Sequence, residues 1–497
     1  MTPPTQSSVR GRPELEPTQL LIDGRLVDAS DKQTSTTVDP ATKTVLTTAA
    51  EASATDVDDA VAAARAAFVS PAWRSMSNDE RGRLLWRVAD LIERDADELA
   101  RLETLDQGQP LSMSRDVNVA MAAQVFRYYA GWATKVEGKV SAVSAPNALH
   151  YTRREPLGVC ALITPWNVPL AIAAWKMAPA LSCGNTVVVK PAEQTPLTTL
   201  KLGRICLEAG IPAGVVNVIT GGPAVGRALV AHPDVDKVSF TGSTAVGQEI
   251  GSVAALTNLK KVSLELGGKA PSIVAPGANI DAAVEGNLQG ALFNTGQACG
   301  AYTRFFVHRS DVDEFTSKIV QAARALTIGP GLTPGNTLGP LISEEHLGRV
   351  GGYVASGVQE GAQLLLDGRH PQGDGLDAGW FFGPTVFGDV TDEMTIAREE
   401  IFGPVLSIMT YDDIDEAVTR ANDSRYGLAA VVWTDNLVTA HGLTERLHAG
   451  TVFVNQLPLI DPAGCWGGFG MSGWGREMGE FAIDEFTGTK GVWINTA

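Results

Sequence analysis

The sequence predicts an α/β protein made of two consecutive α/β units. Short apolar runs recur from residue 158 onward, and a helix-like stretch fills each gap between them. The runs of the first unit are Gly158–Thr164, Asn185–Lys190, Val215–Ile219, Lys237–Phe240 and Lys260–Leu264. Strands that alternate with helices at this spacing are typical of βαβ units, which form a parallel sheet.

The second half of the chain repeats this pattern. Further strands are predicted at Pro271–Val274, Arg304–His308, Val405–Tyr411, Leu428–Trp433 and Thr451–Val454. Helices are predicted over Asp311–Leu326 and over Glu344–Glu360, where Gly361 ends the second one, since glycine commonly follows the last helical turn. We therefore expect a second α/β unit beside the first.

The N-terminal third has mainly helical signals. Thr55-x-x-Asp58 and Ser77-x-x-Glu80 have the form of a capping box or come near it, each just before a helical stretch. After the second, one apolar helix face is formed by Leu84, Leu85, Val88, Leu91 and Ile92. The segment Met1–Pro17 is rich in Pro, Ser and Thr and has no apolar core of a secretory signal, so we expect a loose tail.

The composition argues against several classes of function. Lys and Arg number 39 against 56 Asp and Glu, so the formal net charge is −17, which disfavours binding to nucleic acid or to anionic lipid. Apolar residues make up 44%, enough for a large core. No apolar run approaches the roughly 18 to 20 residues of a membrane span. We expect neither a nucleic-acid partner nor a membrane segment.

The cysteines and histidines argue against disulfides and metal sites. Five cysteines are few for 497 residues and odd in number, so a reduced, cytoplasmic setting fits better than a disulfide framework. The seven histidines are scattered, and neither an HxxxH nor a CxxC motif occurs. We therefore expect no metal.

One cysteine stands in an unusual loop. Cys299 lies in Gly296-Gln297-Ala298-Cys299-Gly300, just after a helix-like stretch. A loop of small residues can expose a thiol and bring backbone N–H groups close to a reacting oxygen. For a cysteine taken alone, however, an inert core position is the favoured interpretation.

Three further motifs follow predicted strands, where ligands of open α/β sheets bind. Glu265 begins Glu265-Leu266-Gly267-Gly268-Lys269, where a carboxylate could serve as an acid or base. The stretch Phe240–Gly247 opens a helix whose N-terminus suits a pyrophosphate, although its spacing is not GxGxxG. Lys190 and Glu193 could bond a ribose. Each motif alone is more simply explained as a capped helix or a solvated turn.

Together these motifs stand in one fixed order, which includes Pro165–Pro169 before them and Glu400–Val405 and Gly473–Glu477 after them. From about residue 18 to its end, the chain resembles the NAD(P)-dependent aldehyde dehydrogenase superfamily. The resemblance implies a Rossmann-type cofactor domain (18–138 and 156–267), a second α/β catalytic domain (268–470) and a small β bridging element (139–155 and 482–497). It also implies a homo-oligomer, a dimer or a tetramer, built through that element.

The resemblance further implies a mechanism. Cys299 would attack the aldehyde as a thiolate, and the amide of Asn167 with the backbone N–H of Cys299 would stabilise the oxyanion. Hydride transfer would leave a thioester, which water activated by Glu265 would hydrolyse to the carboxylic acid. Lys176 and Glu477 match positions proposed in the family for relaying protons.

The cofactor contacts carried over by the resemblance lie in the motifs already described. They are Ile163, Thr164, Trp166, Lys190, Glu193, Phe240, Gly242, Ser243, Leu266, Glu400 and Phe402. Glu193 favours NAD, because its carboxylate pairs with a free 2′-hydroxyl and would repel a 2′-phosphate. Some family members with this Glu nevertheless accept NADP.

The positions that match the family's substrate tunnel are all apolar. They are Met121, Val168, Ala171, Trp175, Phe293, Leu457, Ile460 and Trp466. Without an arginine among them, a carboxylate-bearing semialdehyde would be buried unpaired, which is costly. We expect a neutral aldehyde, aromatic or medium-chain aliphatic, and give a broad-range detoxifying enzyme nearly equal weight. Trp466 stands in place of a Phe, and Gly470 in place of a Lys, of the family's usual tail motif.

Two other functions compete with this one. A CoA-acylating dehydrogenase would typically lack the Glu at position 265. A non-catalytic NAD-binding protein of the same fold should have lost the nucleophile or the oxyanion donor, whereas Cys299 and Asn167 are both present.

Overall fold

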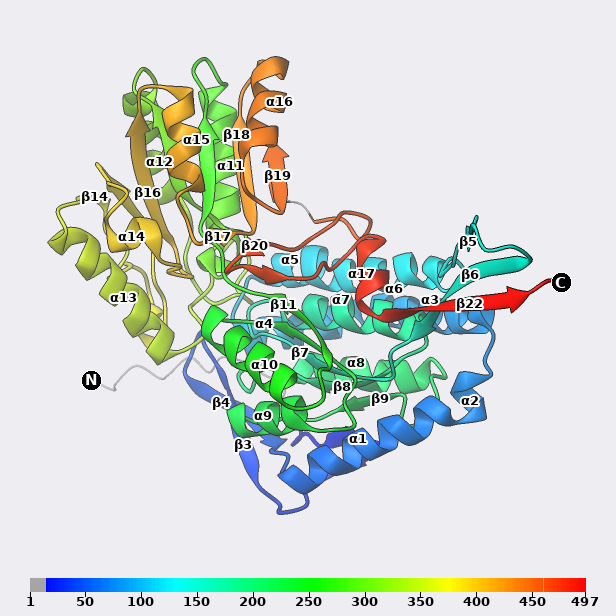
Figure 1. The fold of residues 1–497 in the computed structure, drawn as a ribbon. Helices are drawn as coiled ribbons and strands as arrows, with labels where there is room; N and C mark the ends of the chain where they lie inside the picture. Colours follow the sequence, from blue (N-terminus) through cyan, green and yellow to red (C-terminus); the bar gives the residue numbers. More distant parts are fainter. Residues whose placement is uncertain (1–14, 459) are drawn as a thin grey trace, which may run out of the picture.

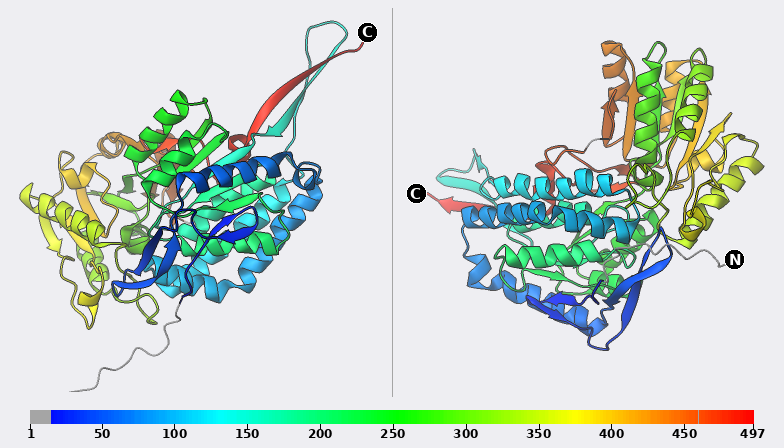
Figure 2. Two further views of the ribbon diagram at one scale, coloured as in Figure 1. Left: turned by 90° about the horizontal axis from the view of Figure 1, so that it is seen from below. Right: turned by 180° about the vertical axis from the view of Figure 1, so that it is seen from behind.

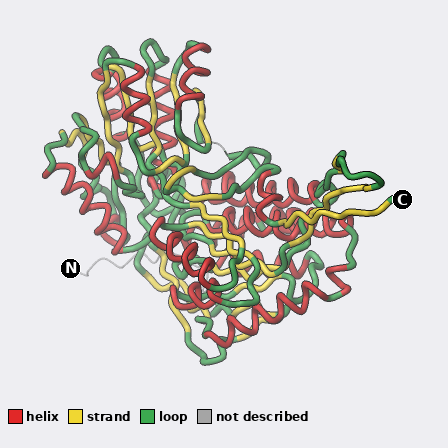
Figure 3. Tube along the Cα trace, in the orientation of Figure 1, coloured by secondary structure: helices red, strands yellow, loops and turns green. Residues whose placement is uncertain are grey.

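The computed structural model describes residues 15–458 and 460–497, and two large sheets with flanking helices organise them (Figure 1). Of the predicted tail, residues 1–14 lie outside the described residues. The α/β fold class is confirmed, and Figure 3 shows helices on both sides of each sheet.

The first sheet contains all five strands predicted for the first unit, each within one residue at either end. Its order is β2 (Arg25–Val27), β1 (Leu20–Ile22), β9 (Val216–Val218), β8 (Thr186–Lys190), β7 (Val159–Ile163), β10 (Lys237–Thr241), β11 (Lys261–Glu265) and β21 (Gly473–Trp474). The strands from β9 to β11 run parallel. β7 and β8 are buried along their whole length, on both faces of the sheet. Their sequences are therefore mostly apolar throughout and do not alternate between apolar and polar residues.

The strand order reverses between β7 and β10. From β7 the chain moves outward through β8 to β9, and then returns to β10 on the other side of β7. In doubly wound sheets a ligand crevice forms at such a reversal, outside the carboxyl ends of the strands. The segments after β7 and β10, which carry two of the predicted motifs, therefore meet at one place.

The second sheet contains the five strands predicted for the second unit, within two residues. Its order is β14 (Gln363–Leu366), β15 (Thr385–Gly388), β16 (Val405–Tyr411), β13 (Tyr302–His308), β12 (Ala270–Val274), β18 (Ala429–Trp433) and β19 (Thr451–Val454). All neighbours are parallel except β14 and β15.

Helices cover both sheets. Around the first lie α1 (Ala54–Val69), α2 (Pro71–Arg74), α3 (Asn78–Arg94), α4 (Ala96–Gln107), α5 (Leu111–Met113), η1 (Ser114–Val119), α6 (Ala120–Trp132), α7 (Pro169–Ser182), α8 (Leu197–Glu208), α9 (Pro223–Ala231), α10 (Thr244–Leu256) and α17 (Phe481–Glu485). With the second go α11 (Ile280–Leu292), η2 (Phe293–Gly296), α12 (Val312–Arg324), α13 (Glu344–Gln359), η3 (Leu376–Ala378), α14 (Thr395–Arg398), α15 (Ile414–Asn422) and α16 (Leu437–Arg446). No helix within the described ranges is long and apolar enough to cross a membrane.

The N-terminal third is mainly helical as predicted, from α1 to α6, but its first strands were not foreseen and one capping box was misplaced. Residues 20–50 form strands, namely β1, β2 and the antiparallel pair β3 (Thr34–Asp39) and β4 (Thr44–Ala50). The box before α1 is made by Ser53 and Asp56, not by Thr55 and Asp58, because the helix begins two residues earlier than the motif implied. The second box, at Ser77 and Glu80 before α3, is confirmed.

A small sheet projects from the body of the molecule (Figure 2). The last strand, β22 (Thr487–Asn495), pairs antiparallel with β6 (Ala148–Pro156) along its whole length, and β6 also pairs with β5 (Val140–Ser141). A further short pair, β17 (Tyr426–Gly427) with β20 (Phe469–Gly470), lies near the junction of the large sheets. The residue limits expected for the three domains stay predictions.

Candidate active site

A cavity of about 310 Å³ joins the two α/β units. Its walls come from the segments after β7, β10 and β11 of the first sheet, and from the Cys299 loop, the start of α13 and the segment after α14 in the second unit. It is lined by Pro165, Trp166, Asn167, Gln194, Thr241, Gly242, Ser243, Leu266, Gly267, Cys299, Ile342, Ser343, Glu345, His346, Arg349, Glu400 and Phe402. Eight of the predicted site residues therefore share one space, at the reversal of strand order.

The Cys299 loop is held in place by amide side chains. Asn167 donates from Nδ2 to the carbonyl of Gln297 at 2.9 Å, and Asn294 donates to the carbonyl of Asn167 at 2.8 Å. Asn294 and Thr295 have positive φ angles of 49° and 57°, which are uncommon for residues other than glycine. These bonds fix the backbone that leads to Cys299, whose side chain is partly exposed.

The charge environment of Cys299 keeps its thiol protonated. Burial raises the pKa of this thiol to about 12, and the charges of Glu400 and Glu265 raise it further, while the backbone N–H groups of Cys299 and Gly300 oppose the shift. Two N–H groups that favour a negative sulfur also suit a negative oxygen formed beside it.

Glu265 is the last residue of β11 and is only 3% exposed to solvent. Neither of its oxygens has a hydrogen-bond partner among the described residues. Burial raises the pKa of Glu265 well above its usual range, Glu477 adds to this, and Lys176 and Arg476 oppose it. An unpartnered buried carboxyl group of this kind calls for a functional explanation, such as a reacting water.

Lys176 and Glu477 form a buried ion pair behind Glu265. Lys176 lies on α7 and is fully buried, and its Nζ pairs with Oε1 of Glu477. Ser239 of β10 accepts a hydrogen bond from Lys176 at 3.0 Å and donates one to Glu477 at 3.1 Å. The sequence motifs gave no signal for Ser239, which closes this triangle.

The end of β10 and the start of α10 provide a cradle for an anion. Ser243 is the N-cap of α10 and accepts a bond from the N–H of Val246 at 3.4 Å. Thr241, just before it, lines the cavity and has a buried hydroxyl without a partner in the described part of the chain. A helix N-terminus and a free hydroxyl that face a cavity fit a pyrophosphate.

Lys190 and Glu193 lie beside the cavity rather than in its lining. Nζ of Lys190 is 3.8 Å from a carboxylate oxygen of Glu193, and burial lowers the pKa of Lys190. Glu193 is well exposed, so its carboxylate is free to accept bonds from hydroxyl groups. Ile163, Thr164 and Phe240 are buried beneath this region and support it.

Glu400 and Phe402 approach the cavity from the second unit. Glu400 accepts a hydrogen bond from the N–H of Gly268 at 2.9 Å. A Cβ atom on Gly267 would stand 2.2 Å from Oε2 of Glu400, so only glycine lets this carboxylate come so close. The ring of Phe402 lies edge-on to Trp166, with centroids 5.3 Å apart.

Several lining residues were not foreseen from the sequence. Gln194, Thr241, Ile342, Ser343, Glu345, His346 and Arg349 all reach the cavity. Thr241 could have been found within the Phe240–Gly247 motif. The residues of α13 could not, because the helical pattern of Glu344–Glu360 does not tell which of its ends meets the other unit.

None of the eight positions predicted for the aldehyde side lines this cavity. Ala171, Trp175 and Trp466 are buried in the main core, and Met121, Val168, Ile460 and Cys299 pack partly exposed against the same core. Val168, Ala171 and Trp175 follow one side of α7 at intervals of three and four residues. Phe293 and Leu457 are partly buried. Their role as a substrate wall stays a prediction.

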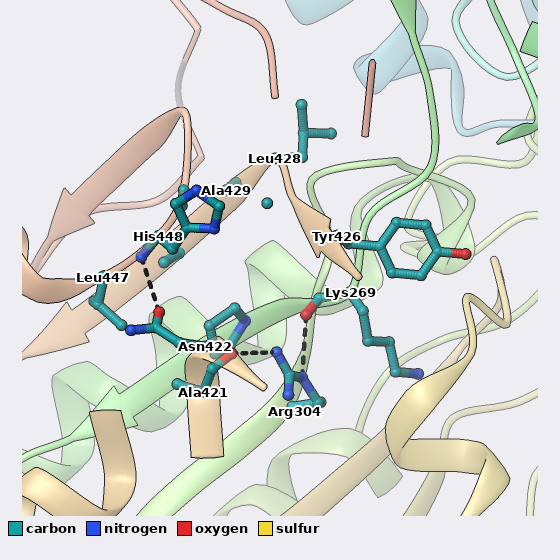
Figure 4. Close-up of a pocket in the computed structure, with 13 residues that line it drawn as sticks. Lys269, Arg304, Ala421, Asn422, Tyr426, Leu428, Ala429, Leu447 and His448 are labelled. Carbon is teal, nitrogen blue, oxygen red and sulfur yellow. Dashed lines mark hydrogen bonds between the residues drawn. The ribbon is translucent and has the colours of Figure 1, made fainter. Parts of the chain in front are cut away.

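A second, much smaller cavity is lined in part by Lys269, the last residue of the Glu265–Lys269 motif (Figure 4). Its volume of about 10 Å³ suits a single water. Arg304 donates to the carbonyls of Lys269 at 3.1 Å and Ala421 at 2.9 Å, and burial lowers its pKa to about 10. This arginine joins loops of the second unit, and the space around it does not fit a substrate.

A thiol with an amide donor, an orphaned carboxyl group and a dinucleotide cradle at one strand reversal define a cofactor-dependent dehydrogenase site. Comparison with known proteins agrees. The model of the aldehyde dehydrogenase family matches residues 26–492. Mitochondrial aldehyde dehydrogenase of Mesocricetus auratus is 48% identical over 97% of this chain and 96% of its own, and the Homo sapiens enzyme is 47% identical over 97% and 93%.

Solved structures give the same result. An NAD⁺ complex of aldehyde dehydrogenase from Bacillus cereus superposes with a TM-score of 0.94 at 43% identity, covering 97% of each chain. The chain belongs to the aldehyde dehydrogenase family. It is an aldehyde dehydrogenase, like the Bacillus cereus enzyme whose solved structure contains NAD⁺.

Proposed function

We propose that the protein oxidises a neutral, apolar aldehyde to its carboxylic acid with NAD, through a thioester on Cys299. The observation that carries this proposal is the placement of Cys299 and Asn167 in one cavity, with the orphaned carboxyl group of Glu265 coupled electrostatically to the thiol. These three groups supply a nucleophile, an oxyanion donor and a base.

Cys299 attacks the aldehyde carbon, and the carbonyl oxygen becomes an oxyanion. Asn167 uses one of its two amide N–H groups to hold Gln297, so the second is free to bond the oxyanion together with the N–H of Cys299. Since the thiol is protonated in the free site, it must first release its proton to water, because the attacking species is the thiolate.

The second half of the reaction uses Glu265 as the base. NAD, when bound, accepts the hydride that leaves the thiohemiacetal. The thioester that remains on Cys299 is attacked by a water, whose proton goes to the carboxylate of Glu265. Lys176 and Glu477 then lie next in line to carry the proton away from the buried site. The C–S bond breaks, and the carboxylic acid departs.

Different residues around the cavity would bind the pyrophosphate, the ribose and the nicotinamide of the cofactor. The N-terminus of α10 with Thr241 and Ser243 would bind the pyrophosphate. Glu193 and Lys190 would hold one ribose, and the carboxylate of Glu193 would disfavour the extra phosphate of NADP. Glu400 and Phe402 would hold the nicotinamide end. We expect NAD to be preferred and NADP to be used weakly.

The aldehyde side favours neutral substrates. The positions predicted there are apolar and packed against the core, so a charged group would lose its hydration without gaining a partner. We expect the thioester to be hydrolysed rather than its acyl group to be transferred to CoA, because Glu265 can act as the base that activates water.

Reduced-nicotinamide absorbance on a panel of aldehydes tests the whole proposal. Benzaldehyde, phenylacetaldehyde and hexanal should be oxidised with NAD in preference to betaine aldehyde and succinic semialdehyde, and added CoA should not change the product. A preference for a charged aldehyde would refute the apolar wall, and an acyl-CoA product would refute hydrolysis.

We further propose that the chain forms a homo-oligomer through the projecting sheet. Val140 is 77% and Trp493 is 60% exposed there, an unusual amount of apolar surface on strands that leave the body of the molecule. The edge strand β19 of the second sheet offers unpaired backbone groups to a neighbouring copy. Light scattering behind a sizing column distinguishes a dimer from a tetramer, and a monomer would refute the proposal.

We also propose a cytoplasmic location. All five cysteines are free thiols, which fits a reducing compartment. Fractionation of the native cells, followed by an antibody against the protein, tests this.

A further inference from the structure

The backbone of Phe402 is held in a costly conformation. Its φ angle is 62°, in the left-handed region that bulky residues avoid. The strained residue carries one of the aromatic rings of the cavity and stands two positions after Glu400. Something outside the loop must hold it there, because a loop on its own would relax.

One face of α13 provides three hydrogen-bond donors to this loop. Nε2 of His346 bonds the carbonyl of Phe402 at 2.7 Å, and Arg349 donates to the carbonyl of Glu400 at 2.7 Å. Tyr353 donates from its hydroxyl to the carboxylate of Glu399 at 2.8 Å. Residues at i, i+3 and i+7 share one side of a helix, so these donors form a row that follows the loop.

The same helix face also packs against the loop. A Cβ atom on Gly403 would stand 2.6 Å from the side chain of Val350, so the backbone after Phe402 touches α13 directly. The rings of Trp166, His346 and Phe402 form a three-membered cluster, with centroids 5.3 to 6.1 Å apart. The loop is therefore fixed by backbone bonds from one side and by rings from the other.

His346 is the best protected of the three donors. It is 8% exposed, and burial lowers its pKa to about 4, so its imidazole is neutral at physiological pH. Because a carbonyl only accepts, Nε2 must carry the proton. Its donor role is thus independent of pH over the working range.

We propose that His346, supported by Arg349 and Tyr353, is a positioning residue that holds Phe402 and Glu400 in their cofactor-facing arrangement. The proposal rests on the proposed placement of the nicotinamide end at these two residues. It assigns the start of α13 to cofactor affinity through the loop that its two backbone donors, His346 and Arg349, hold in place, in addition to the part of the cavity wall that both side chains form. When His346 loses its donor, the Phe402 backbone relaxes and the loop must be reordered each time NAD binds, which lowers affinity.

The test compares His346→Ala with His346→Gln, which keeps an amide donor of similar reach. Steady-state kinetics give KM for NAD, KM for hexanal and kcat, and thermal unfolding checks the fold. His346→Ala should raise KM for NAD about tenfold, which corresponds to one lost hydrogen bond, with KM for hexanal unchanged. His346→Gln should stay within about threefold of the wild type. His441→Ala, an exposed histidine on α16, is the matched control.

A purely structural role predicts a different pattern. It would lower the melting temperature and the amount of active enzyme, and would leave KM for NAD unchanged in the molecules that remain folded. That result would overturn the proposal, as would a His346→Gln variant that loses as much NAD affinity as His346→Ala. Arg349→Gln and Tyr353→Phe should weaken NAD binding less than His346→Ala, because both side chains are more exposed.

Direct NAD binding separates this proposal from the proposed function. Calorimetry with NAD is repeated in the Cys299→Ala background, where turnover is not needed. A weaker Kd caused by His346→Ala there supports the positioning role even if Cys299 proves not to be the nucleophile. An unchanged Kd refutes it even if the enzyme oxidises aldehydes as proposed.

Discussion

The two sides of Cys299 differ in kind. On one side is a cavity of about 310 Å³, to which both α/β units contribute hydroxyls, amides and two carboxylates, together with the N-terminus of α10 and several apolar side chains. The positions expected to meet the aldehyde are apolar, and six of the eight belong to or pack against the main core, as Cys299 itself does. A dinucleotide is bound by particular polar groups, whereas a neutral aldehyde needs only an apolar surface. Apolar residues that bind a substrate cannot be distinguished by type from apolar residues that stabilise the core.

The largest effect is expected when the thiol of Cys299, which both the cofactor side and the aldehyde side need, is removed. Cys299→Ala should lower turnover by at least about three orders of magnitude, because nothing else in the cavity can form the thioester. NAD binding, measured by calorimetry, should persist, since the cradle of α10 is untouched. Cys465→Ala is the control, as Cys465 is the other partly exposed cysteine and should leave turnover within about twofold. Near-normal activity of Cys299→Ala would mean that the nucleophile lies elsewhere.

The next effect concerns the base. Glu265→Gln keeps the shape of a side chain that has no partner among the described residues, so the fold should be retained. Deacylation should slow by about two to four orders of magnitude. Rapid mixing should then show a burst of NADH equal to the active sites, followed by a slow steady state. Glu480→Gln, on an exposed glutamate, should behave as the wild type. A steady state as fast as that of the control would remove Glu265 from the water step.

The charges around Glu265 predict two opposite shifts in pH dependence. Since the base acts as a carboxylate with a raised pKa, the rate of deacylation should fall as the pH drops through that pKa. Glu477→Gln removes a charge that raises the pKa, so the acid limb should move to lower pH. Arg476→Gln removes a charge that lowers it, so the limb should move to higher pH. Each shift should be about one unit or less, read from pH profiles of the burst and steady-state rates. Shifts in the same direction would contradict the assignment of this limb to Glu265.

The cofactor side should respond more modestly to charge. Glu193→Ser removes the exposed carboxylate beside Lys190, so the penalty on a 2′-phosphate should disappear. The ratio of kcat/KM for NAD to that for NADP should fall about tenfold or more, mainly through a lower KM for NADP. Glu249→Ser, on the outer side of α10, tests whether any loss of surface charge does the same. A ratio that stays at the wild-type value would place the ribose elsewhere.

The motifs of the polar side carry a physical signal in the sequence, but each alone is too weak to identify a site. Strand-end motifs such as Glu265–Lys269 combine a chemistry-bearing residue with glycines that the close approach of Glu400 requires, and their fixed order along the chain led to the family resemblance that assigns the site. Most of the ten predicted strands are buried along their length and are therefore visible in the sequence as short apolar runs. The N-terminal strands were missed, since β2 is only three residues long and mostly exposed, and β3 is a run of mainly polar residues without a continuous apolar pattern.

What the sequence did not reveal depends on contacts between distant segments. His346 bonds Phe402 across 56 positions, and Ser239 meets Lys176 and Glu477 across 63 and 238. Neither residue belongs to a motif, and each owes its place to the way a whole helix or strand is docked. For this reason the residues of α13 that line the cavity could not be predicted from the sequence.

The smallest effect is expected on the aldehyde side, at Trp466. Its ring is 4% exposed, and its tip would stand 2.9 Å from a Cβ atom on Gly300, directly beside Cys299. Trp466→Phe should shift the ratio of kcat/KM for phenylacetaldehyde over hexanal by only about threefold, since part of the freed volume adjoins the reactive thiol and part lies in the core. The same change should lower the free energy of unfolding by roughly 1–3 kcal/mol, because a buried ring is replaced by a smaller one. If denaturation shows this loss while the aldehyde ratio does not move, Trp466 belongs to the core alone. A tenfold shift would instead make it the residue that shapes the substrate wall.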